Sequence, residues 1–197
     1  LQSRSFQENT LTVATALFGE DLDEHVLRQM VESTITFDAP LVPLSENLYA
    51  LELFHGPTAA FKDFGARFMS RMLGHFAESE SRLITILAAT SGDTGSAVAN
   101  GFLGVPGTRV VVLYPSGKVS DIQEKQFTTL GENIIALEVE GSFDDCQRMV
   151  KEAFQHRELN GRMVLTSANS INLARLLPQT FYYFHALAQL PAGSRPM

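Results

Sequence analysis

The chain has 197 residues, 45% of them hydrophobic and 19% charged, with a formal net charge of −7. This length suits one domain of ordinary size, and the composition excludes disorder over most of the chain. The negative charge argues against nucleic acid or anionic lipid as a general partner, and the single cysteine excludes an internal disulfide and a multi-cysteine metal site.

The N-terminal region is predicted to be helical. Apolar residues recur every three or four positions over residues 9–34, with an acidic break at 20–23, so we expect two short helices. Pro40 and Pro43 then mark an extended passage that leads into a strand over 48–54. We place the main domain start near residue 46, which gives a helical segment over 1–45, an α/β domain over 46–190 and a tail over 191–197.

The rest of the chain alternates between strand-like and helix-like segments, which is typical of βαβ units. Strands are predicted over 83–89, 109–114, 133–139 and 163–166. Helices are predicted over 62–76, 94–103, 120–130, 143–154 and 171–190. The run of apolar residues at 110–113 is typical of a strand that is covered on both faces. The expected fold class is therefore α/β, with a central parallel sheet flanked by helices.

The first of three informative strand-to-helix junctions carries Lys62, which falls in or near the first turn of its helix. A cation there faces the positive end of the helix dipole, at a cost of about 0.3–1 kcal/mol. Two interpretations follow: an amine nucleophile for a carbonyl group, or a surface lysine paired with Asp63 or another acid. Position alone favours the second.

The second junction, residues 90–96, is rich in glycine and small polar residues. Backbone amides at a helix N-terminus bind carboxylates or phosphates, and open α/β sheets bind ligands at the carboxyl ends of their strands. The spacing fits neither a Walker loop nor G-x-G-x-x-G, so a nucleotide is not indicated. A simple helix cap made by Ser91 or Asp93 explains the same residues equally well.

The third junction, residues 166–175, brings small polar residues before Arg175. Arg175 follows Asn169 by six positions, so the two side chains converge only if Asn169 lies in the loop before the helix. They would then suit an oxyanion. The alternative is an N-cap at Ser167, Asn169 or Ser170, with Arg175 in an ordinary surface ion pair.

Together and in this order, the motifs closely resemble the threonine synthase family, within the fold type II (tryptophan synthase β-like) pyridoxal-phosphate enzymes. The resemblance covers residues 51–190 and is strongest at residues 55–64, 90–95, 114–123 and 167–175. Residues 10–40 also resemble the helical region that precedes the catalytic domain in that family.

The resemblance implies a role for each junction and reverses the interpretation of Lys62 from position alone. Lys62 matches the lysine that forms a Schiff base with pyridoxal 5'-phosphate and then moves protons, with Phe61 and Asp93 as further cofactor contacts. Related cysteine synthases have Asn at the Asp93 position, and a carboxylate can only accept hydrogen bonds there. The implied substrate-binding residues are Thr90, Ser91, Gly92, Thr94 and Gly95 for the α-carboxylate, and Lys118, Asn169 and Arg175 for the phosphate.

The implied reaction converts O-phospho-L-homoserine and water to L-threonine and phosphate. In the family, the loop that holds the cofactor phosphate lies beyond the position of Leu190. We therefore expect a truncated enzyme with an incomplete large domain, inactive alone. Alternatives are another fold type II lyase such as a serine or threonine dehydratase, a cysteine synthase, a non-catalytic binding protein of this family, or a nucleotide-binding α/β domain.

Location and assembly are predicted from weaker signals. No apolar run approaches the length of a membrane span, residues 1–12 lack a signal-peptide pattern, and one cysteine fits a reducing compartment, so we expect a cytoplasmic protein. Truncation would expose an apolar patch on the last helix and so favour a dimer, unless that helix packs back into the core. The patch residues are Phe181, Tyr182, Tyr183, Phe184 and Leu187.

Overall fold

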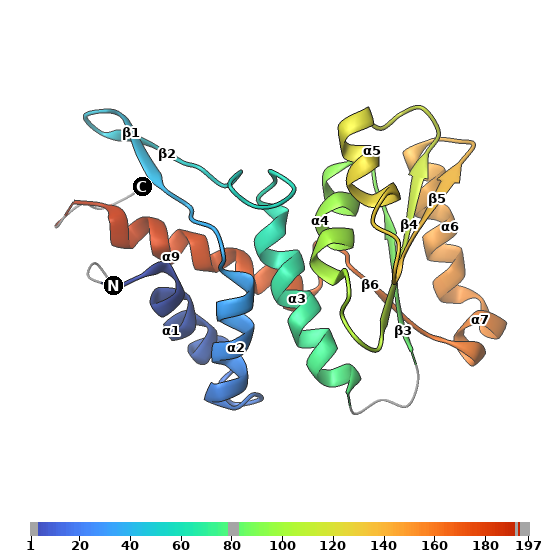
Figure 1. Ribbon diagram of the computed structural model, residues 1–197, viewed down its shortest axis with the longest axis horizontal. Helices are drawn as coiled ribbons and strands as arrows, with labels where there is room; N and C mark the ends of the chain where they lie inside the picture. The colour runs from blue at the N-terminus through green and yellow to red at the C-terminus, as the bar shows by residue number, and fades with distance from the viewer. Residues whose placement is uncertain (1–3, 79–82, 192, 194–197) are drawn as a thin grey trace.

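The computed structural model describes residues 4–78, 83–191 and 193. A helical group with a small hairpin lies on one side, and a parallel sheet covered by helices lies on the other (Figure 1). The helical group consists of α1 (Phe6–Phe18), α2 (Glu24–Thr34) and α9 (Thr180–Gln189). None of the helices in these residues is long and apolar enough to cross a membrane.

Two helices open the chain, as predicted: α1 (Phe6–Phe18) and α2 (Glu24–Thr34). The start of α1 is fixed by a capping box, in which Ser5 Oγ accepts from the Glu8 amide at 3.2 Å and the Glu8 carboxylate accepts from the Ser5 amide at 2.7 Å. The acidic break between the two helices forms a turn.

An antiparallel hairpin follows, formed by β1 (Leu41–Ser45) and β2 (Leu48–Leu51). The sequence predicted only the second strand, and predicted it three residues too long, because prolines usually mark the absence of a strand. Pro43 is tolerated in β1 because a two-stranded hairpin consists of edge strands. The predicted domain boundary near residue 46 falls in the hairpin turn and stays a prediction.

The central sheet contains β3 (Ile84–Ala89), β4 (Thr108–Pro115), β5 (Ile134–Val139) and β6 (Val164–Ser167) in the order β5-β4-β3-β6. All of its pairs are parallel, and each predicted strand is confirmed to within one residue at either end. Helices α3 (Lys62–Ala77), α4 (Asp93–Phe102) and α5 (Asp121–Thr128) lie on one side (Figure 1). On the other side lie α6 (Phe143–Gln155) and the short α7 (Arg157–Arg162), which the sequence analysis missed.

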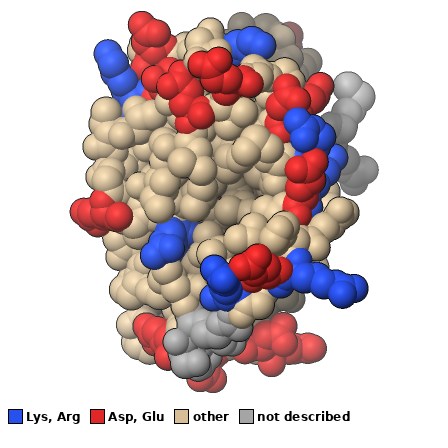
Figure 2. Space-filling model, turned by 90° about the vertical axis from the view of Figure 1, so that its right-hand side faces the viewer, with Lys and Arg blue, Asp and Glu red and all other residues tan. Residues whose placement is uncertain are grey.

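The two faces of the sheet are covered unequally. On the α3–α4 face, Ile86, Val110 and Val112 are fully buried. On the α6 face, Ile135 and Leu137 of β5 stay 41% and 45% exposed, since α6 packs mainly over β3 and β4. Seen from the α6 side, the centre of the surface carries no charged side chains and is hollowed (Figure 2).

The single helix predicted over 171–190 is wrong. The segment breaks into α8 (Leu173–Leu176), a 3₁₀ turn η1 (Leu177–Gln179) and α9 (Thr180–Gln189). Pro178 explains the break, because proline has no amide hydrogen and clashes with the preceding helical turn.

The aromatic patch expected on the last helix is divided between core and surface. Phe181 and Tyr182 are buried, each with its ring centroid 5.3 Å from an α3 phenylalanine, Phe68 and Phe64 respectively. This part of the exposed-patch prediction is wrong, because α9 packs on α3 and α1. The exposed remainder is Tyr183, Phe184 and Leu187.

Helix α9 also holds the N-terminal region in place (Figure 1). The His185 ring stacks on Phe6 at 4.1 Å, and His185 Nε2 lies 3.1 Å from Asp38 Oδ1. Gln189 accepts from the Leu41 amide and donates to the Ala39 carbonyl, both at 2.9 Å. The first and last described helices thus form one layer.

Candidate active site

A cavity of about 660 Å³ lies where β3 and β6 end, within the size range of small-molecule sites. Its walls come from the start of α3, the start of α4, one side of α6, and the segment from β6 to η1. Among the described residues that line it, three are basic and none is acidic: Lys62, Lys151 and Arg175. In a chain with net charge −7, this concentrates positive charge in one place.

Lys62 is the first residue of α3. Its Nζ donates to Asp93 Oδ2 at 2.9 Å and lies 4.6 Å from the centroid of the Phe61 ring. The partner of the lysine is therefore Asp93, and not the neighbouring Asp63. The Lys62 side chain is 21% exposed, so its amine reaches the cavity while its stem is held.

The loop before Lys62 is fixed by Asp63, which is buried. Its carboxylate accepts from the Thr58 amide at 2.9 Å and from Thr58 Oγ1 at 2.6 Å. Burial raises the pKa of Asp63, and the hydrogen bonds from Thr58 oppose that shift. Gly56 packs so closely on Asp63 and Phe37 that any side chain at residue 56 would clash. These contacts set the position from which Lys62 enters the cavity.

The loop over residues 90–95 is held by Thr90. Thr90 Oγ1 accepts from the amides of Gly92 at 3.0 Å and Gly95 at 2.8 Å, so two amides expected to bind an anion already have an acceptor. Gly92 has a φ of 143°, which favours glycine. Neither Ser91 nor Asp93 caps α4, whose N-cap is Gly92.

Only one of the five residues expected to bind a carboxylate lines the cavity, and it is Thr94. Thr90, Ser91, Gly92 and Gly95 are not among its lining residues.

Asp93 accepts hydrogen bonds on both carboxylate oxygens. Besides the bond from Lys62, its Oδ1 accepts from Gln123 Nε2 at 2.5 Å. The hydrogen bond from Lys62 lowers the pKa of Asp93 more than desolvation raises it. Asp93 is thus an ionised acceptor, as the sequence comparison with amide-bearing relatives implied.

The sequence analysis did not identify Gln123 as a site residue. The S-x-x-Q spacing of Ser120 and Gln123 also fits a capping box at the start of α5, so the spacing alone does not identify the glutamine as a site residue.

The third junction brings Asn169 and Arg175 together. Helix α8 starts only at Leu173, after the N-cap Asn172, so Asn169 lies in the preceding loop and both side chains line the cavity. This meets the geometric condition for the pair to converge.

Arg175 is only 3% exposed, and within the described part of the chain it forms no ion pair. Its Nη1 donates to the Ala168 carbonyl, while its buried Nε has no partner among the described residues. Burial lowers the pKa of the guanidinium, and arginine nevertheless keeps its charge in proteins. Helix α3 approaches Arg175 so closely that a side chain at Gly65 would clash with the Arg175 carbonyl. A rigid, positively charged group thus forms one wall of the cavity.

The structure does not bring Lys118 into the cavity. Its Nζ donates to the Gly141 carbonyl at 3.0 Å and so joins the loops after β4 and β5. A contact of Lys118 with substrate therefore stays a prediction.

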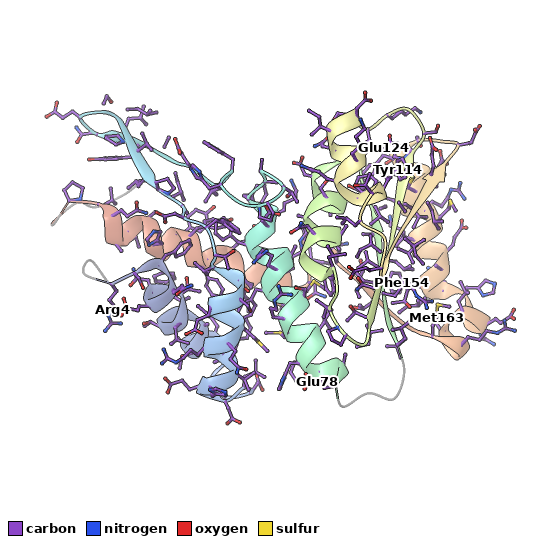
Figure 3. The ribbon with its side chains drawn as sticks, viewed as in Figure 1. Arg4, Glu78, Tyr114, Glu124, Phe154 and Met163 are labelled. Atoms are coloured by element: carbon purple, nitrogen blue, oxygen red, sulfur yellow. The ribbon has the colours of Figure 1, made fainter. Side chains whose placement is uncertain are left out.

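One side of α6 was missed as a wall of the cavity. It contributes Phe143, Gln147, Val150, Lys151 and Phe154. Phe154 lies between α6 and the sheet (Figure 3). The apolar residues of α6 recur at helical spacing, which is typical of a helix face that packs into a core. Only Cys146 is fully buried on this helix, so the apolar face is partly open, and only the structure shows this.

Comparisons with known proteins agree with the fold. The sequence profile of the family "Pyridoxal-phosphate dependent enzyme" matches residues 33–192. The threonine synthase of Serratia marcescens is 49% identical over 195 residues, which cover 99% of this chain and 45% of that protein. The threonine synthase of Escherichia coli K12 is 49% identical over 190 residues, covering 96% of this chain and 44% of that protein.

Solved threonine synthase structures share the fold of this chain. A threonine synthase of Brucella melitensis with bound PLP superposes with a TM-score of 0.92 at 40% identity, covering 99% of this chain and 43% of that chain. Threonine synthase from yeast superposes with a TM-score of 0.88 at 38% identity, covering 98% and 41%.

The chain spans less than half the length of these relatives, in line with the expectation of an incomplete large domain. The sequence profile and the shared fold therefore show that this chain belongs to the family of pyridoxal-phosphate dependent enzymes.

Proposed function

We propose that this chain is the lysine-bearing part of a threonine synthase, which converts O-phospho-L-homoserine and water to L-threonine and phosphate. The observation that carries the proposal is one cavity, without acidic lining among the described residues, that holds the Lys62 amine and the buried Arg175 guanidinium. Such a cavity suits a small substrate that carries a phosphate group. The 49% identity to threonine synthases supports the same choice within the family.

The residues at the start of α3 fit pyridoxal 5'-phosphate. Lys62 offers a primary amine at the cavity wall, Phe61 offers an aromatic face beside it, and Asp93 offers a fixed negative charge. We assign Lys62 as the covalent attachment point and the other two as contacts. When bound, the cofactor supplies an electron sink that makes the protons at the substrate Cα and Cβ removable.

Other residues would bind and orient the substrate. Arg175 and Asn169 would hold the phosphate ester, since a guanidinium matches the geometry of phosphate oxygens. Thr94 is the loop residue that we assign to the α-carboxylate. Lys62 Nζ, which lines the same cavity as Arg175, would carry protons between Cα, Cβ and Cγ.

The bonds balance with water as the only co-reactant. The C–O bond at Cγ breaks and phosphate leaves with the electron pair, while a C–O bond from water forms at Cβ. The proton lost from Cβ is balanced by one gained at Cγ, and the proton removed from Cα is returned. The proton that the attacking water gives up goes to the released phosphate.

Labelling tests the site assignment. The chain is titrated with pyridoxal 5'-phosphate, reduced with borohydride and mapped by peptide mass spectrometry. We expect the label to be concentrated on Lys62; a label spread evenly over all lysines would contradict the assignment.

An activity assay tests the reaction. A chimaera that joins this chain to the unmatched remainder of the Escherichia coli relative should release phosphate from O-phospho-L-homoserine, whereas the chain alone should not. Turnover of threonine in place of phosphohomoserine would favour a dehydratase.

The proposal also includes two finer expectations. We place the reaction in the cytoplasm, which the buried free thiol of Cys146 supports.

We also propose self-association through the exposed side of α9, where Tyr183, Phe184 and Leu187 are apolar and accessible. Sedimentation of the chain and of a Tyr183→Lys variant measures the second expectation, and an unchanged monomer in both would contradict it.

A further inference from the structure

A chain of hydrogen bonds runs from α5 to Lys62. Ser120 Oγ donates to Gln123 Oε1 at 2.9 Å, Gln123 Nε2 donates to Asp93 Oδ1 at 2.5 Å, and Lys62 Nζ donates to Asp93 Oδ2 at 2.9 Å. We propose that Gln123, oriented by Ser120, is a positioning residue that fixes the Asp93 carboxylate against the Lys62 amine. This inference rests on the proposed function and extends it to two residues outside the cavity lining.

The direction of the Gln123 amide follows from its neighbours. Ser120 is the N-cap of α5, and its Oγ accepts from the Gln123 backbone amide at 3.4 Å, which leaves the hydroxyl hydrogen for Gln123 Oε1. The amide nitrogen must then face Asp93, where an ionised carboxylate can only accept. The reversed amide would place two acceptors against each other.

The backbone around Gln123 is built for this contact. Ser96 Oγ donates to the Gln123 carbonyl at 3.3 Å, which ties α4 to α5. The Gln123 side chain occupies the space where a side chain at Gly92 would lie, so glycine is required there for contact as well as for its φ of 143°. The 90–95 loop and α5 therefore dock through Gln123.

The two hydrogen bonds to Asp93 matter because its side chain is 49% exposed. A carboxylate at such exposure would rotate freely between lysine and water if only one oxygen were held. Donors on both oxygens fix its plane, and they also favour the charged form of the group. Gln123 thus sets both the orientation of the anion that faces Lys62 and its resistance to protonation.

Titration of Asp93 tests the proposal without any cofactor. The carboxyl group is followed by ¹³C NMR in the chain and in the Gln123→Leu variant, which keeps the shape but lacks the donor. We expect the pKa of Asp93 to rise toward its ordinary value in Gln123→Leu. It should also rise, by less, in Ser120→Ala, where the amide is free to turn. Gln126→Leu, on the same helix, is the matched control and should leave the titration unchanged.

A second readout uses the chimaera. Gln123→Leu should lower kcat about tenfold, the equivalent of one hydrogen bond, leave KM nearly unchanged and move the acid side of the pH–kcat profile to higher pH. Gln123→Glu should retain activity only at low pH, because its carboxyl group donates a hydrogen bond only when protonated.

The outcomes separate the two proposals. Identical Asp93 titration in the wild-type chain and in a folded Gln123→Leu variant would overturn the positioning role. Absence of pyridoxal label on Lys62 in the chimaera, with an Asp93 titration that responds to Gln123, would overturn the proposed function and leave the positioning role standing. If Gln123→Leu fails to fold, Ser120→Ala decides by the same measurement.

Discussion

Two basic side chains share the cavity and are held in opposite ways. Lys62 is partly exposed and faces a carboxylate, whereas Arg175 is 3% exposed and faces no acid, with its Nε lacking a partner among the described residues. An amine that faces an ionised acid in contact with water can exchange protons. A buried guanidinium keeps its charge, and its missing partner is an anion that a ligand can supply. The comparison supports our proposal that proton transfer takes place at the start of α3 and charge recognition at the β6–α8 segment.

The largest expected effect comes from removing the exchangeable amine. Lys62→Ala should lower turnover of the chimaera by at least about 10³-fold, at the upper range of what one proton-transfer group contributes, because it also removes the covalent attachment point. Lys125→Ala, at an exposed position of α5, is the control and should stay within about twofold of wild type. Steady-state phosphate release measures both variants, and a Lys62→Ala enzyme with more than a tenth of wild-type kcat would break the comparison.

The second-largest expected effect comes from replacing Arg175, the buried cation. Arg175→Lys keeps a cation but loses the two-pronged geometry, so KM for O-phospho-L-homoserine should rise about 10- to 100-fold, the range of hydrogen bonds to charged groups. The exposed Arg109→Lys is the matched control. If Arg175→Lys lowers kcat while KM stays constant, Arg175 acts in the chemical step and the division of roles is wrong.

The third effect is on stability. Gly65→Ala places a methyl group against the Arg175 carbonyl and should destabilise the fold by about 1–3 kcal/mol, which exceeds the gain in helix propensity of about 1 kcal/mol. Gly161→Ala in α7 has open space around the added methyl and should be neutral or stabilising. Urea unfolding of the two variants measures the difference, and equal stabilities would show that α3 and α8 separate at little cost.

The smallest effect is a change in pH dependence. The pKa of Asp93 is lowered in the folded protein, so the native state binds fewer protons there than the unfolded state. The resulting stability is present above the ordinary carboxyl pKa of about 4 and is lost as the pH falls through the lowered value. Asp93→Asn should therefore flatten the loss of unfolding free energy below about pH 4, whereas the exposed Asp144→Asn should follow wild type. Parallel curves for the two variants would contradict the paired state of Asp93.

Much of the fold could be predicted because β3 to β6 are short runs bounded by turns, and their parallel pairing follows from the βαβ pattern. The errors have identifiable causes. Pro43 concealed β1, and the break at Pro178 was overlooked although proline is the strongest signal for one.

The site was less predictable because its contacts cross long stretches of chain. The choice between Asp63 and Asp93 as the partner of Lys62 depends on the loop that Thr58 and Asp63 fix, and neither periodicity nor spacing describes that loop. Lys118 has the right charge in the right motif, yet the loop after β5 takes its amine.

The contact between the first and last described helices has a consequence for synthesis of the protein. The bonds that join α9 to residues 38–41 connect positions 147 to 150 apart in the sequence. At a translation rate of about 5–20 residues per second, the side of α1 that receives α9 waits on the order of ten seconds for its partner. During that interval Phe6 lacks the His185 ring that stacks on it in the folded chain, and the rest of α1 lacks the cover of α9.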